Sequence, residues 1–231
     1  MPNNSRRMQS SKKNFVFLIL LFCSTVFAQE DFSAKIDSLV SELPKLKDTA
    51  YVNALNKLSS WNLPNSISNS RIYANKALEK SQALNYIKGE GMAWYNLGKY
   101  YNKDSNYDSA LYCFIKSQTL FESQPNLNQT ELCKTLGSIG QAYYFQGKYD
   151  KAIAHFFKAL KLAEKLNDYA LIAQNYNSLG NSNYFQSNNK IALEYYSQAT
   201  RYWMLAKNEL RAAGTLDNIG LIYCKLGRYE E

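Results

Sequence analysis

Residues 94–101, Trp-Tyr-Asn-Leu-Gly-Lys-Tyr-Tyr, contain the motif from which the fold can be predicted. Trp94, Leu97 and Tyr101 are separated by three and four positions, so they lie on one face of an α-helix. Gly98 lies inside this helix, where glycine costs about 1 kcal/mol relative to alanine. A glycine at such a position indicates that a second helix approaches closely at that point.

The same motif returns along the chain at a nearly constant interval. Its glycine recurs as Gly98, Gly140, Gly180 and Gly220, so the period is close to forty positions. A polar turn follows each of them, and after the turn an alanine recurs with an aromatic residue four positions later, as Ala110 and Phe114, Ala152 and Phe156, and Ala192 and Tyr196. This self-similarity predicts helix–turn–helix units that bury their apolar faces by stacking on one another.

The pattern resembles the tetratricopeptide repeat. The W-x2-L-G-x2-Y…A-x3-F signature of that family is matched by Trp94, Leu97, Gly98, Tyr101, Ala110 and Phe114. The period is about six residues longer than the usual 34, as in the repeats of bacterial sensor and regulatory proteins. The resemblance covers residues 51–231 and implies an all-α fold, a right-handed superhelical solenoid of stacked antiparallel helix pairs.

The period also divides the chain. We expect a signal peptide at 1–28, an N-terminal amphipathic helix or cap at 29–50, a degenerate repeat at 51–88, full repeats at 89–128, 129–170 and 171–210, and a truncated repeat with only its first helix at 211–231. Leu58 and Trp61 replace the repeat glycine and tyrosine in the degenerate unit, as expected of a terminal cap. The truncated repeat predicts a fragment of a longer protein, with self-association through the uncapped helix as one consequence.

Residues 1–28 have the organisation of a secretory signal. A basic region from Arg6 to Lys13 precedes an apolar stretch from Phe15 to Phe27, and Ala28 is a small residue at the expected cleavage site. A membrane span needs about 20 apolar residues, which is more than this stretch provides, so we expect cleavage, with a retained anchor as the alternative. No later segment is apolar enough to span a bilayer. We therefore expect a periplasmic or extracellular protein, either released or tethered to the membrane within a longer parent.

Composition and charge argue against nucleic-acid binding. The chain has 19 tyrosines but only four prolines and ten glycines, which suits long helices with short connections. Its formal net charge of +8 includes four basic residues and no acid within positions 1–28, so the remainder carries +4. A mixed surface of this kind lacks the basic stripe of a phosphate-binding protein.

The candidate chemistry is sparse. The one histidine, His155, has no recurring nucleophile or carboxylate beside it, and no Gly-rich phosphate loop is present. Three cysteines follow the signal, Cys113, Cys133 and Cys224, at spacings that match no zinc motif. We interpret all three as small buried hydrophobic residues, with a bridge between the first two left open because they lie on adjacent predicted helices. We expect no catalysis, metal or cofactor within this segment.

A binding function is better supported than catalysis, because the first helices carry polar and aromatic residues at positions that the packing pattern does not use. In tetratricopeptide arrays the first helix of each pair lines the concave face, and related arrays bind peptides there through asparagines and lysines. The candidate partner-binding residues at these positions are Lys99, Lys134, Gln141, Tyr144, Asn177, Asn181 and Tyr184. The two lysines would attract a carboxylate, the two asparagines would meet a peptide backbone, and the tyrosines would offer apolar contact. In the alternative, the aromatic residues pack on the next repeat beside a solvated groove.

These features predict an exported scaffold that binds a protein or peptide through its concave face. The resemblance adds an alternative, the extracytoplasmic sensor portion of a histidine kinase or transcriptional regulator. An envelope assembly scaffold and an enzyme with a catalytic domain beyond residue 231 also remain open.

Overall fold

The computed structural model describes residues 33–124 and 126–227, so the predicted signal peptide at 1–28 lies outside the described residues. The chain divides into two compact units, Met1–Lys47 and Asp48–Glu231. In the first unit, residues 33–42 are helical, and the short 3-10 helix η1 (Leu43–Lys45) follows. Pro44 stands at its start, where a missing backbone N–H is tolerated.

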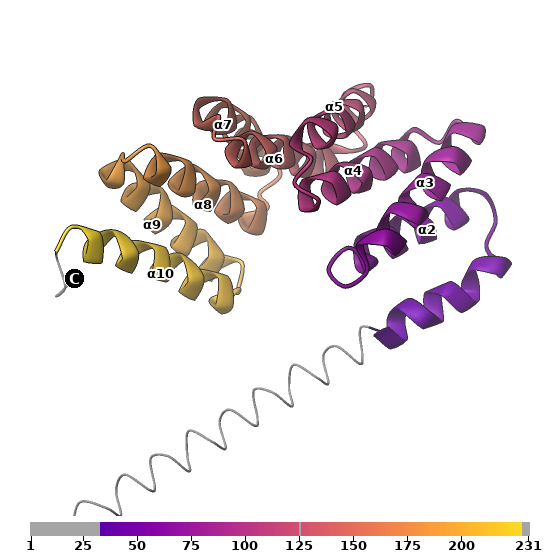
Figure 1. Cartoon of the computed structure of the whole chain (residues 1–231), viewed down its shortest axis with the longest axis horizontal. Coiled ribbons are helices and arrows are strands. Elements are labelled where there is room, and N and C mark those ends of the chain that lie inside the picture. Colours follow the sequence, from indigo (N-terminus) through magenta and orange to yellow (C-terminus); the bar gives the residue numbers. More distant parts are fainter. Residues whose placement is uncertain (1–32, 125, 228–231) are drawn as a thin grey trace, which may run out of the picture. The chain divides into compact units, whose positions relative to one another are not determined.

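The described part of the second unit is built from helices alone. They are α2 (Asp48–Asn62), α3 (Ile67–Ala83), α4 (Ile87–Lys103), α5 (Tyr107–Glu122), α6 (Gln129–Phe145), α7 (Tyr149–Lys165), α8 (Tyr169–Phe185), α9 (Asn189–Leu205) and α10 (Glu209–Lys225). Within this unit each helix packs on its neighbours in sequence, and the pairs follow one another along a stack (Figure 1). The predicted all-α solenoid of stacked antiparallel helix pairs is confirmed.

The lengths of these helices explain the long period. Helices α6, α7, α8 and α9 each contain 17 residues and are joined by three-residue turns, so a pair with its two turns repeats every forty positions. The connection between α5 and α6 is longer, because α5 ends at Glu122 and α6 begins at Gln129. This longer connection explains why Gly98 and Gly140 stand slightly farther apart than the later repeat glycines.

The three-residue turns share one backbone conformation. Their middle residue has a positive φ, as at Ser105 (59°), Gly147 (72°) and Ser187 (63°). The next amide then donates to a carbonyl five residues earlier, for example from Lys148 to Tyr143 at 2.9 Å. This bond satisfies a carbonyl that the helix end leaves open, and the turn sends the next helix back antiparallel.

A glycine and an aromatic ring meet inside each full helix pair. A Cβ atom at Gly98 would stand 2.5 Å from the ring of Phe114, and one at Gly140 would stand 2.7 Å from Phe156. Gly180 faces the ring of Tyr196 in the same way, at 2.6 Å. The absence of a side chain therefore allows the two helices to approach, with the ring buried between them.

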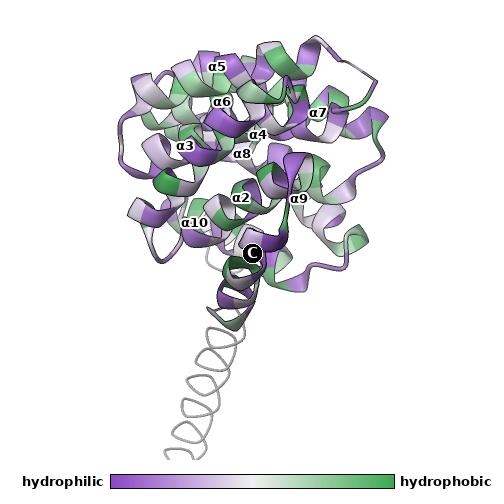
Figure 2. Cartoon of the chain, turned by 90° about the vertical axis from the view of Figure 1, so that its right-hand side faces the viewer, coloured by the Kyte–Doolittle hydropathy of each residue, from purple (hydrophilic) through white to green (hydrophobic). Residues whose placement is uncertain are grey.

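The stack has an inner layer of helices. In addition to their sequence neighbours, α2 packs on α4, α4 on α6, and α6 on α8. Hydrophobic and hydrophilic segments alternate around most helices, as expected for elements that bury one stripe and expose the other (Figure 2). The first helix of each pair thus contributes one face to the packing and leaves another for the inner surface.

Helix α10 is less buried than the preceding helices of this unit. Leu216 is 53% exposed and Leu221 is 61% exposed, and a Cβ atom at Gly220 would meet nothing within 4 Å. Cys224 is exposed, so its prediction as a buried residue was wrong, because α10 packs on α9 and no helix follows it among the described residues. In the described part of the chain, no helix has the length and apolar content of a membrane span.

Replacing Gly98 by alanine should destabilise the protein. The new methyl group would overlap the buried Phe114 ring, and overpacking of this kind costs about 1–3 kcal/mol, more than alanine gains in helix propensity. The free energy of unfolding, measured by urea denaturation, should fall accordingly. Gly220→Ala is the matched control, since its site is open, and should be neutral or slightly stabilising. Equal effects of the two substitutions would contradict this account of the packing.

Candidate functional site

The inner helices enclose a groove in two adjoining pockets, which we call the inner groove. The first pocket has a volume of about 340 Å³. It is lined by Ser60, Met92, Tyr95, Asn96, Lys99, Cys133, Lys134, Gly137, Ser138, Leu171, Gln174 and Asn175. The second, of about 250 Å³, is lined by Gln174, Asn177, Trp203, Leu210, Arg211, Gly214, Thr215 and Asn218. Gln174 borders both pockets, so they are adjacent.

The charges of the inner groove have one sign. Lys99 and Lys134 line its first pocket and Arg211 its second, whereas no aspartate or glutamate of the described residues lines either pocket. Burial lowers the pKa of Lys99, and the nearby charge of Lys134 lowers it further. The two ammonium groups therefore repel each other in a partly desolvated site, and an anion placed between them would relieve both effects.

Asparagine side chains form the floor of the first pocket. Asn96 is 2% exposed, and its Nδ2 donates to the backbone oxygen of Asn56 at 3.0 Å and to its Oδ1 at 3.1 Å. Asn56 in turn donates to the Gly89 carbonyl at 2.9 Å. The Oδ1 of Asn96 is buried without a hydrogen-bond partner among the described residues. Asn96 and Asn56 thus form a buried polar network that joins α2 to α4 beneath the groove.

The other walls combine aromatic and polar groups. The Ser138 hydroxyl donates to the Tyr95 hydroxyl at 3.5 Å. In the second pocket, the Arg211 guanidinium lies 5.8 Å from the centre of the Trp203 ring. The inner groove therefore offers flat apolar surface next to donors and cations, an arrangement suited to a ligand with both apolar and acidic groups.

The structure separates the seven predicted site residues into two groups. Lys99, Lys134 and Asn177 line the inner groove, whereas Gln141, Tyr144, Asn181 and Tyr184 are outside the lining of both pockets. Asn177 and Asn181, which were predicted to bind a peptide backbone together, have different neighbours. The Oδ1 of Asn177 accepts from Asn218 Nδ2 at 3.4 Å, and that of Asn181 accepts from the Tyr196 hydroxyl at 2.7 Å.

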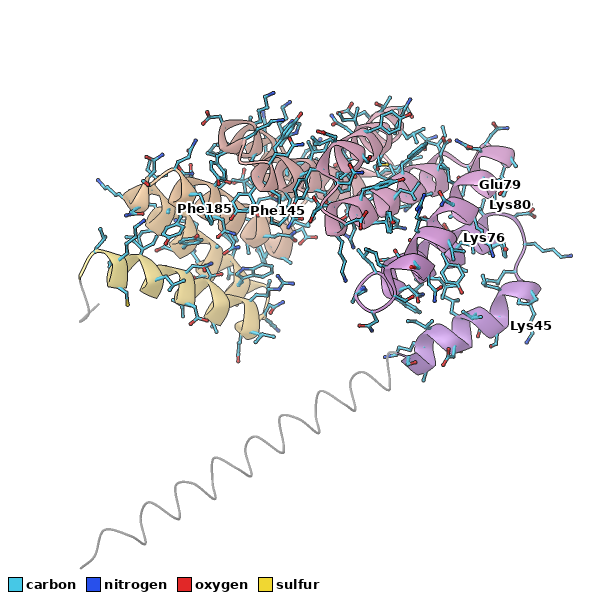
Figure 3. All side chains as sticks on the ribbon, in the orientation of Figure 1. Lys45, Lys76, Glu79, Lys80, Phe145 and Phe185 are labelled. Carbon is cyan, nitrogen blue, oxygen red and sulfur yellow. The ribbon has the colours of Figure 1, made fainter. Side chains whose placement is uncertain are left out.

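The two tyrosines belong to a row of aromatic rings along the turns. The ring of Tyr107 stacks on that of Phe145 with 5.7 Å between ring centres, and the ring of Tyr149 stacks on that of Phe185 with 5.9 Å between centres. Tyr144 contacts three of these rings at 5.4–5.7 Å, and Tyr184 packs on Phe185 at 5.6 Å. Figure 3 shows Phe145 and Phe185 on neighbouring inner helices. These rings join one helix pair to the next, as the alternative interpretation of the sequence predicts.

Several groove residues are not among those predicted from the repeat pattern, including Asn96, Ser138, Asn175 and Arg211. A signal was present for two of them. The position two residues before each repeat glycine is polar, as Asn96, Ser138, Ser178 and Asn218. A polar residue that recurs two positions before the packing glycine lies on the side of the first helix that faces away from the second helix of its pair.

The other candidate reactive groups, Cys113, Cys133 and His155, are packed among other side chains. Cys113 and Cys133 are buried free thiols, so the bridge left open by the sequence is not formed. Burial raises the pKa of each to about 11, which keeps both thiols protonated at neutral pH. The His155 ring packs 5.5 Å from Tyr143, and burial, followed by the charge of Lys158, lowers its pKa. In the part of the chain that the structure describes, no group of histidine, cysteine or acidic residues is arranged to hold a metal ion.

Replacing Lys134 by glutamine should raise the pKa of Lys99, because it removes the second of the two causes that lower it. Since the folded-state pKa of Lys99 lies below its unfolded value, the unfolded chain binds more protons between the two values, and stability rises with pH through that window. The variant should flatten this rise. NMR titration of the Lys99 Cε signal measures the pKa, with Lys158→Gln as the control. An unchanged Lys99 pKa would show that the two charges do not interact.

Comparison with known proteins supports the repeat assignment. A family model described as tetratricopeptide repeat matches residues 89–165 and 131–204, which together span half of the chain. A search of the curated proteins found no significant match.

Three solved structures illustrate the proteins whose fold is similar. A signal transduction ATPase with a tetratricopeptide repeat sensor from Pyrococcus horikoshii is 20% identical, with a TM-score of 0.71 over 84% of this chain and 30% of its own. A Rap protein complexed with competence and sporulation factor is 16% identical, with a TM-score of 0.72 over 86% of this chain and 55% of its own. PlcR from Bacillus thuringiensis, in complex with the peptide PapR7 and DNA, is 15% identical, with a TM-score of 0.69 over 89% of this chain and 74% of its own.

At these identities the likeness shows the fold alone. The family match, the forty-residue helix pairs and the glycine–aromatic contacts agree with one another, and the chain belongs to the tetratricopeptide repeat family.

Proposed function

We propose that the chain is an exported scaffold that binds an extended peptide in the inner groove, and that the peptide carries at least one carboxylate. The observation that carries the proposal is the charge of the groove, which among the described residues is lined by Lys99, Lys134 and Arg211 and by no acidic side chain. A carboxylate beside Lys99 would gain a charge-assisted hydrogen bond. It would also offset the repulsion between the two lysines.

The shape and polarity of the inner groove favour a peptide over a compact anion. The groove runs from α2 to α10 through Gln174, and it carries amide groups along its length. Gln174, which borders both pockets, offers an amide donor and acceptor to a peptide backbone. The structure of PlcR, which has a similar fold, holds the peptide PapR7, and this supports a peptide as the ligand.

Binding of acidic peptides tests this proposal. Fluorescein-labelled seven-residue peptide libraries, matched in length and biased toward glutamate, lysine or neither, are compared by fluorescence anisotropy. The glutamate-rich library should bind most tightly, and added salt should weaken it. Lys134→Glu should reduce this binding about tenfold or more, since a charged hydrogen bond contributes about 1.5–3 kcal/mol. Lys158→Glu on α7, outside the groove lining, is the matched control. Equal affinity for the acidic and basic libraries would contradict the proposal.

Export rests on the sequence of residues 1–28 and is tested separately. Expressed in a bacterial host, the protein should be recovered outside the cytoplasm with Gln29 as its first residue. N-terminal sequencing and mass spectrometry measure the cleavage site. Recovery of intact protein beginning at Met1 from the membrane fraction would support the retained anchor instead.

The sensor portion of a longer signalling protein is the second candidate function. It is favoured by the likeness to the tetratricopeptide repeat sensor from Pyrococcus horikoshii, of which this chain spans 30%. The two candidates share the peptide-binding groove and differ in the segment that comes after it. The reading frame after residue 231 distinguishes them, because a sensor linked to a cytoplasmic output domain requires an apolar stretch of about 20 residues there.

A further inference from the structure

A further cavity, which we call the outer pocket, lies on the other side of α4, between α3 and α5. Its volume is about 470 Å³, within the usual range of ligand sites. It is lined by Asn75, Leu78, Trp94, Leu97, Tyr101, Asp108, Ser109, Tyr112 and Cys113. None of these residues lines the inner groove, so the outer pocket is a separate site.

The walls of the outer pocket are aromatic, and its charge is negative. The rings of Trp94 and Tyr112 meet edge to face, with centres 5.9 Å apart and planes at 83°, and Tyr101 adds a third ring. Among the described residues, Asp108 is the one charged side chain of the lining. Lys116 lies 5.6 Å over the Tyr112 ring but is not part of the lining. Aromatic faces beside a carboxylate attract a cation on an apolar stem.

The next helix pair shows how such a place is filled. There, the Lys151 ammonium lies 5.6 Å over the Tyr143 ring. Lys151 comes 42 positions after Ser109, and Tyr143 comes 42 positions after Tyr101, so the two pairs of residues are equivalent in neighbouring repeats. The short serine leaves open the space that the lysine side chain takes in the neighbouring pair.

The carboxylates of the two places are also alike, although Leu136 and Ala154 stand where the outer pocket has Trp94 and Tyr112. The carboxylates that precede Ser109 and Lys151 occupy equivalent positions, and each accepts a hydrogen bond from a glutamine of the following pair. Gln146 Nε2 donates to Asp108 at 2.8 Å, and Gln186 Nε2 donates to Asp150 at 2.7 Å. Since each glutamine contacts one carboxylate oxygen, the other oxygen of Asp108 is left for a cationic ligand.

We propose that the outer pocket binds a lysine or arginine side chain from a partner polypeptide. The ammonium or guanidinium group lies over Tyr101 and beside Asp108, at the place equivalent to that of Lys151. The apolar stem packs against Leu78 and Trp94. This site is independent of the inner groove and of the acidic ligand proposed for it.

Capped tripeptides test the proposal on the unmodified protein. N-acetyl-Ala-Lys-Ala-amide and its arginine, norleucine and glutamate counterparts are titrated while the indole N–H signal of Trp94 is followed by NMR. The signal is assigned by its loss in Trp94→Phe. The lysine and arginine peptides should shift it saturably and bind about five- to tenfold more tightly than norleucine, as expected for a partly desolvated cation over aromatic rings. No shift, or equal binding of norleucine, would overturn the proposal.

The repeats supply matched variants. Ser109→Lys should fill the outer pocket with the chain's own ammonium and abolish peptide binding while the thermal unfolding transition is retained. Asp108→Asn keeps the acceptor for Gln146 and removes the charge, so the preference for lysine over norleucine should disappear.

Two results with these reagents would contradict the proposal. Undiminished binding to Ser109→Lys would show that the peptide does not enter the outer pocket. Binding of n-butylammonium as tight as that of the lysine peptide would show that the site takes a small organic cation and not a partner side chain.

Discussion

Contact between a glycine on one helix and an aromatic ring on its partner sets the separation of each full helix pair. The Phe114 ring fills the place where Gly98 lacks a side chain, and the next two pairs repeat the arrangement. The first pair exchanges the sizes, since Leu58 stands at the glycine position and Ala74 at the aromatic position, and both are fully buried. The combined volume of the two positions is thus kept while their individual sizes vary, as close packing requires.

The inner groove follows from this contact. Because the glycine face of each first helix is taken by its partner, a different face of the same helix is left to line the groove. The residues on that face include Asn96 and Lys99, which lie within two positions of Gly98 in the sequence. One turn of helix therefore supplies both the packing contact and the groove lining, and helix pairs added in the same register extend the groove.

The aromatic residues show how a pattern in one helix can be misassigned. Tyr144 and Tyr184 follow their repeat glycines by the same number of residues, which marks them as a column but not as a binding surface. The structure places them in a row of rings that includes Phe145 and Phe185 and that joins successive pairs. Lys99 and Lys134 were predicted from the same helix face and do line the groove. The difference depends on which side chains of other helices each residue meets, which periodicity does not contain.

The helical repeat, its forty-residue period and the packing role of Gly98 and its equivalents could all be predicted from the order of amino acids. These are local and periodic properties, because the residues of one helical face, and the two helices of one pair, lie close together in the sequence. Three other features required the folded chain: Asn175 lines the inner groove, Asn181 accepts a hydrogen bond from Tyr196, and Ser109 lines the outer pocket. Each depends on side chains brought together from different helices, where the length of a single neighbouring residue determines whether a space is filled.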